Sequence, residues 1–107
     1  LIAQHKSMQD ESLLVEAMGL LQRLLKAAEE GERTGSMIEI LIMQALACEV
    51  QDKISLGLAP LKRALSLAAP EGYVRIFVDE GVPMRHLLLE AKKQHIMPNY
   101  CDKLLAV

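Results

Sequence analysis

The sequence has no large excess of charge of either sign. Its 107 residues include 12 basic and 14 acidic side chains, which are scattered and give a net charge of -2. Direct binding to a nucleic-acid backbone needs a clustered basic surface. The sequence also has no GxxxxGK[ST] phosphate-binding loop. We therefore expect no direct nucleic-acid contact by these residues and no nucleotide cofactor.

Long apolar runs and cysteine pairs are missing as well. No apolar run reaches the roughly 18 residues of a membrane span, and no secretory signal pattern opens the sequence. The two cysteines, Cys48 and Cys101, lie in apolar helical patterns without CxxC spacing, which is typical of reduced thiols. These absences predict a soluble, cytoplasmic protein that does not contact a membrane.

No combination of residues in the sequence is suited to catalysis or metal binding. A set of acid, base, nucleophile and oxyanion donor is not found, so we expect neither an enzyme nor a cofactor. His86 and Glu90 are one helical turn apart, but His95 is predicted to point about 140° away, which leaves no third metal ligand. Asp79 and Glu80 diverge by about 100° and are interpreted as a solvated helix end.

What the sequence does contain is an internal repeat. Residues 14–31 align with residues 54–71 at a spacing of 40, and Arg23 then matches Arg63. Fixed periods between about 20 and 50 residues indicate helical solenoids, in which stacked units bury one another's apolar faces. The aligned apolar positions are Leu21, Leu25 and Ala28 with Leu61, Leu65 and Ala68. We predict one all-α helical-repeat domain over residues 1–107, with repeats at about 7–33 and 36–69 and C-terminal helices over 71–107.

Helix boundaries are predicted from capping and breaking residues. Ser7 with Asp10 is a start signal, and the first helix should end near Gly31 or Gly35. Its apolar stripe is Leu14, Ala17, Leu21, Leu24, Leu25 and Ala28. A capping box at Ser36 and Glu39 should start the second helix, which is apolar nearly all round and should be buried.

The remaining helices are predicted from proline and glycine. A third helix should cover Ser55 to Ala69, with Pro60 delaying its start or kinking it, and should end at Pro70 and Gly72. Residues 73–79 suit a strand by composition, but a short helix is preferred because all their neighbours are helical. Pro83 and Pro98 should open the last two helices.

The two repeats resemble tetratricopeptide units. Ala17, Ala45 and Gly57 fall where that family has small residues, and Pro70 falls near its closing proline. The period of 40 departs from the usual 34. The resemblance implies a concave, partner-binding surface that maps onto Glu39, Ile42, Leu46, Glu49 and Val50.

Nearly the whole chain also resembles the helical-repeat segment of large, ATP-dependent LuxR-type transcriptional regulators related to the maltose-regulon activator. The resemblance is carried by residues 14–30, 34–46, 59–65, 70–75 and 78–84. It implies a signal-sensing or coupling module that receives a protein partner or a small-molecule inducer, with ATP binding and DNA binding in domains absent from this chain. The alternative is a freestanding tetratricopeptide-like scaffold for protein–protein interaction.

The sequence begins at Leu1 rather than at methionine, which suggests a piece of a larger regulator. The apolar stripe of residues 14–28 would then lack a partner helix. We therefore expect self-association of the chain, with exchange of helices as one route.

Overall fold

A computed structural model of the chain describes residues 2–106, with side chains from residue 15 onward. Within that part every regular element is helical and no strand is present, which confirms the all-α, tetratricopeptide-like prediction. The elements are α1 (Ile2–Glu30), α2 (Thr34–Val50), α3 (Ile54–Ala68), the 3₁₀ helix η1 (Ala69–Glu71), α4 (Arg75–Val78), α5 (Val82–Lys93) and α6 (Pro98–Leu105).

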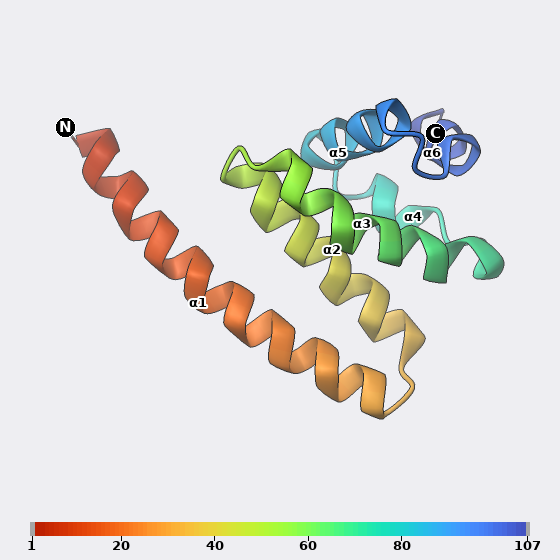
Figure 1. Cartoon of the computed structure of the whole chain (residues 1–107), viewed down its shortest axis with the longest axis horizontal. Helices are drawn as coiled ribbons and strands as arrows, with labels where there is room; N and C mark the ends of the chain where they lie inside the picture. Colours follow the sequence, from red (N-terminus) through yellow and green to blue (C-terminus); the bar gives the residue numbers. More distant parts are fainter. Residues whose placement is uncertain (1, 107) are drawn as a thin grey trace.

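The helices α1 and α2 form one antiparallel hairpin, and α2 and α3 form the next (Figure 1). α2 packs between α1 and α3, and α5 packs across both α2 and α3, with α6 against α5. This arrangement gives an elongated body with principal dimensions of 45 × 32 × 22 Å. α2 is therefore the helix that the other elements surround.

The turns that reverse the chain share one hydrogen-bond geometry. After α1, the Arg33 amide donates to the carbonyl of Ala28 (2.9 Å) and the Glu32 amide to that of Glu29 (3.2 Å). These are the 6→1 and 5→2 bonds of a Schellman motif, which puts the residue after the helix in the left-handed conformation. That residue is Glu32 after α1, Asp52 after α2, Gly72 after η1 and His95 after α5, with φ of 53°, 60°, 70° and 60°. Glu32, Asp52 and Gly72 recur every 20 residues, half of the spacing of 40 in the sequence.

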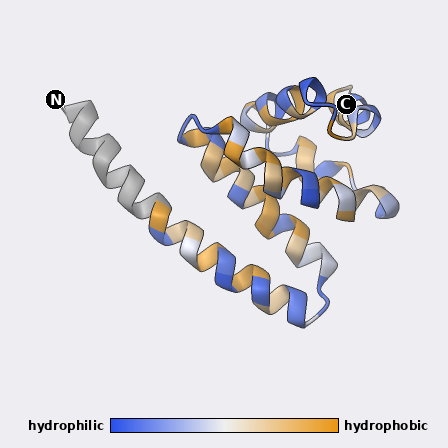
Figure 2. Ribbon diagram, in the orientation of Figure 1, coloured by the Kyte–Doolittle hydropathy of each residue, from blue (hydrophilic) through white to orange (hydrophobic). Residues whose placement is uncertain are grey.

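α2 is buried on most of its surface, as its composition predicts. The ribbon of α2 is coloured as hydrophobic over most of its length (Figure 2). Ile38, Leu41, Ile42 and Ala45 are at most 2% exposed, and only Glu39 and Met43 are open to solvent in the middle of the helix. A helix that is apolar nearly all round is stable only when neighbours cover it. α1, α3 and α5 provide that cover.

Gly57 allows a close approach between helices, as the tetratricopeptide resemblance implies. A Cβ atom at this position would lie 3.0 Å from the carbonyl oxygen of Ala45, 3.1 Å from Cβ of Cys48 and 3.2 Å from Leu87. Gly57 therefore sits where α3 meets both α2 and α5. Ala17, its counterpart in the first repeat, is exposed.

The segment between the second repeat and α5 is a short helix rather than a strand, which confirms the preferred prediction. Phe77 of α4 is fully buried and packs edge-to-face on Tyr100 of α6, with ring centroids 6.3 Å apart. The Tyr100 hydroxyl donates to the carbonyl of Tyr73 and so ties α6 to the start of this segment.

Two predicted helix starts are wrong. α1 runs without a break through Ser7, because the residues before it favour helix and leave the serine no helix end to cap; its side chain lies outside the described part. α2 starts at Thr34, not at Ser36, and its N-cap Arg33 makes no side-chain cap. The Schellman turn after α1 leads directly into α2. The carbonyl of Arg33 therefore already accepts a hydrogen bond from the Met37 amide (2.9 Å).

Two further expectations also need correction. Pro60 lies well inside α3, which begins at Ile54, so the proline does not delay the start of that helix. In the apolar stripe of α1, Leu25 and Ala28 are buried, but Ala17 is exposed and Leu24 is 46% exposed, because α2 covers only part of the stripe. Leu14 lies outside the described side chains.

Candidate functional site

The surface that includes two of the predicted partner-binding residues is a hollow between α2 and α4. Ile42 and Met43 lie three and four residues after Glu39 on α2, so both lie next to it on the helix surface. Ile76 faces them from α4, and Asp79 and Glu80 follow where that helix ends. The hollow has a volume of about 290 Å³.

This hollow combines an apolar floor with an acidic rim. Ile42 is 2% exposed, whereas Met43 is 48% exposed and open to a ligand. Glu39, Asp79 and Glu80 are exposed, and none of them forms an ion pair with another described side chain. Such a site can bind one apolar side chain that has positive charge beside it.

The other predicted partner-binding residues are not part of this hollow. Leu46 packs partly buried against the core. The carboxylate of Glu49 accepts a hydrogen bond from Nδ1 of His86 at 3.1 Å, so it links α2 to α5. Val50, the last residue of α2, is 68% exposed. The five residues therefore do not form one open surface.

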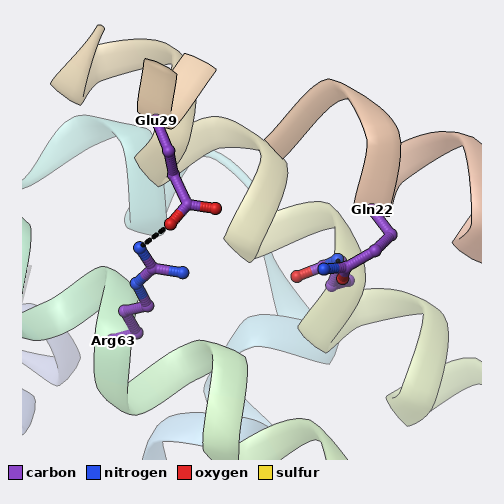
Figure 3. Close-up of polar contacts among 4 residues, drawn as sticks. Gln22, Glu29 and Arg63 are labelled. Carbon is purple, nitrogen blue, oxygen red and sulfur yellow. Dashed lines mark hydrogen bonds and ion pairs between the residues drawn. The ribbon is translucent and has the colours of Figure 1, made fainter. Parts of the chain in front are cut away.

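Polar side chains tie α1 to the rest of the chain. Arg63 of α3 contacts Glu29 of α1 at 2.7 Å (Figure 3). Gln44 of α2, which is only 6% exposed, donates from its amide nitrogen to the side-chain oxygen of Gln22 at 3.3 Å. Both contacts join the C-terminal half of α1 to the second and third helices.

A second hollow lies against α5 and is lined mainly by apolar, lysine and histidine side chains. It has a volume of about 650 Å³ and is lined by Ile54, His86, Leu89, Glu90, Lys92, Lys93 and His95. The expectation that His95 points away from His86 and Glu90 is wrong, because α5 ends at Lys93 and the following left-handed turn brings His95 back to this hollow. Among the described residues no three potential ligands gather closely enough to hold a metal ion.

Both cysteines are free, and neither has the character of a nucleophile. Burial raises the pKa of the Cys101 thiol above its ordinary value, and Asp102 raises it further, against a smaller opposing effect of Lys92. Burial also raises the pKa of Cys48, with Lys53 opposing. A raised pKa keeps a thiol protonated at neutral pH, which makes it inert.

The residues that sequence reasoning missed are Met43, Ile76, Asp79 and Glu80. Asp79 and Glu80 were interpreted as a solvated helix end, and they are indeed exposed. Their proximity to Glu39, 40 residues earlier, depends on how α4 packs on α2. No local pattern in the sequence contains that information.

Comparison with known proteins identifies the family of the chain. A family model described as the MalT-like TPR region matches residues 1–94. The chain therefore belongs to the MalT-like TPR region family, which confirms the resemblance to the helical-repeat segment of such regulators. No curated protein and no solved structure matches the chain. None of the described helices combines the length and apolar character that crossing a membrane requires.

Proposed function

We propose that this member of the MalT-like TPR region family is the signal-sensing or coupling module of a cytoplasmic LuxR-type transcriptional regulator. The observation that supports the proposal most directly is the family match over residues 1–94. In this proposal the module binds a partner and performs no catalysis. ATP binding and DNA contact belong to other domains of the regulator.

The hollow between α2 and α4 is the surface that we propose for this binding. Its volume of about 290 Å³ is just below the range of small-molecule pockets, which starts at about 300 Å³. One aliphatic side chain fits this space better than a whole inducer does. The rim of Glu39, Asp79 and Glu80 favours a partner segment that carries lysine or arginine beside that side chain.

Binding at this place would act on the relative positions of α2 and α4. The floor comes from α2, and the facing wall comes from α4 and the residues that follow it. A ligand shifts an equilibrium between two arrangements only by binding one of them better. A ligand that contacts both helices favours the arrangement in which they lie at the distance seen here.

The alternative function is a freestanding scaffold that uses the same hollow without any link to DNA. The coding sequence on both sides of the chain distinguishes the two. A nucleotide-binding module upstream and a helix-turn-helix soon after Val107 are expected for the regulator. Stop codons close to both ends would overturn the regulator proposal and favour the scaffold.

The binding surface is tested by titrating the labelled chain with a short peptide that has one leucine flanked by lysines, followed by NMR. We expect shifts in the signals of Ile42, Met43 and Ile76. Exchanging Glu39→Gln, Asp79→Asn and Glu80→Gln together should weaken binding about three- to fivefold, because each exposed charge pair contributes a few tenths of a kcal/mol.

Two controls make this titration specific. Glu71→Gln removes one exposed carboxylate outside the hollow and should leave the affinity unchanged. A peptide with glutamates in place of the lysines should not bind. Equal affinity for both peptides, or shifts that cluster elsewhere on the chain, would show that the α2–α4 hollow is not the partner site.

A further inference from the structure

One face of α1 is apolar and uncovered. Ala17 and Ala27 are exposed, and Leu20 and Leu24 are 50% and 46% exposed. These residues are spaced by three, four and three positions, so they form one stripe along the helix. α2 covers the neighbouring stripe of Leu25 and Ala28 and leaves this one open.

The small side chains of Ala17 and Ala27 make this face suitable for close contact with another helix. Glu16, Ala17, Gly19, Leu20 and Arg23 together line a shallow hollow on α1. Gly19 lies roughly 120° from the centre of the stripe, beyond the edge that carries Glu16 and Arg23. A second helix can therefore approach α1 most closely at Ala17 and Ala27 of the stripe.

The two charged residues at the edge of the stripe, Glu16 and Arg23, are complementary to the same two residues of a second copy. Glu16 and Arg23 are seven residues apart, which is about two turns, so both lie on the same edge. At about 1.5 Å per residue they are roughly 10 Å apart along the axis, too far to pair within one helix. Neither forms an ion pair with another described side chain.

We propose that a second copy of the chain docks on this face, with the two α1 helices antiparallel and the two-fold axis between Gly19 and Leu20. Glu16 and Arg23 lie at equal distances of about 5 Å on either side of that point along the helix. The axis therefore brings Glu16 opposite Arg23 of the partner subunit, and Arg23 opposite Glu16 of the partner subunit. Such a two-fold contact uses the same patch on both copies.

The apolar side chains agree with this register. Leu20 lies within about 1 Å of the axis along the helix, so the two copies of Leu20 meet there, and Leu24 extends the contact away from the axis. A parallel pairing would instead place each residue level with its own copy, Glu16 beside Glu16 and Arg23 beside Arg23. Like charges at that distance disfavour that arrangement. The proposal rests on α1 alone and is independent of the hollow between α2 and α4.

Charge exchange tests this register, with the dimer dissociation constant measured by sedimentation equilibrium. Glu16→Arg or Arg23→Glu alone turns both symmetric ion pairs into repulsive contacts and should raise the dissociation constant about tenfold. The double variant Glu16→Arg, Arg23→Glu reverses both pairs and should return the constant to within about twofold of the original.

Matched controls separate the register from general effects of charge. Lys26→Glu makes the same change of charge as Arg23→Glu, but on a side chain about 140° from the stripe, and should leave the constant unchanged. Leu24→Glu should abolish the dimer while circular dichroism shows the helix content retained. A chain that stays monomeric at several hundred micromolar, or a double variant that shows no recovery, would overturn the proposal.

Discussion

The first and third helices carry the same apolar spacing in very different surroundings. Ala17 and Leu24 of α1 correspond to Gly57 and Ala64 of α3, 40 residues later. In α3 both positions are buried between neighbours, whereas in α1 both are exposed. The spacing thus determines that a helix forms and which side is apolar. Whether that side is covered depends on which other helices are present.

The difference has a consequence for stability. α3 is held by α2 and α5 along most of its length, with Leu61 and Leu65 fully buried. α1 is held through its C-terminal half, where Leu25 and Ala28 are buried and Glu29 contacts Arg63. The chain is therefore one packed unit from α2 onward, with a helix attached to it at one end.

The largest expected contrast lies between a buried residue of the packed unit and an exposed residue of α1. Phe77→Ala removes a fully buried ring and should lower the free energy of unfolding by about 3–5 kcal/mol. Leu24→Ala removes a side chain that is 46% exposed and should cost no more than about 0.5 kcal/mol in the monomer. Chemical denaturation at a concentration where the chain is monomeric measures both values. Similar losses for the two variants would refute the contrast.

A contrast of intermediate size places the same substitution, glycine to valine, in α3 and in α1. Gly57→Val forces a branched side chain against the backbone of Ala45 and should destabilise the chain by about 1–3 kcal/mol. Gly19→Val meets nothing within 4 Å and should change stability by no more than about 0.5 kcal/mol. The midpoint of thermal unfolding distinguishes the two. If valine were tolerated equally well at Gly57, the close approach of α3 to α2 would be wrong.

The smallest contrast substitutes the residues of positive φ that follow α1 and η1. Glu32 follows α1 with φ of 53°, and Gly72 occupies the corresponding position 40 residues later with φ of 70°. Left-handed backbone costs a residue with a Cβ about 1 kcal/mol. Glu32→Gly should therefore stabilise the chain by about 0.5–1 kcal/mol, and Gly72→Glu should destabilise it by a similar amount. Denaturant midpoints that shift in the same direction for both variants would contradict this.

Much of the fold was predictable from local patterns. Apolar spacing predicted the helices, and Gly72 and Pro98 marked an end and a start that the structure confirms. The helix starts predicted at Ser7 and Ser36 are wrong. A capping side chain acts only at the residue where a helix begins, and both serines lie inside helices that begin earlier in the chain. His95 was misplaced because helical spacing no longer applies after α5 ends at Lys93.

The candidate site was predictable only in part. Glu39 and Ile42 were placed on the partner-binding surface through the tetratricopeptide resemblance, and they do line the hollow. Ile76 and Asp79 were not, because they join that hollow through the packing of α4 on α2. Glu49 was taken as a surface residue, whereas its carboxylate is bound by His86 from a helix far along the chain. Contacts of this kind follow from tertiary structure, which sequence spacing alone does not encode.

The central claim is that the open face of residues 17–27 in α1 becomes covered by a second copy of the chain. Amide hydrogen exchange at two protein concentrations tests it most directly. Well below the dimer dissociation constant, amides of residues 17–24 should exchange at least about tenfold faster than those of residues 38–45 in α2. Well above that constant, residues 17–24 should gain protection while residues 38–45 stay unchanged. Equal protection of the two segments at both concentrations would contradict the claim.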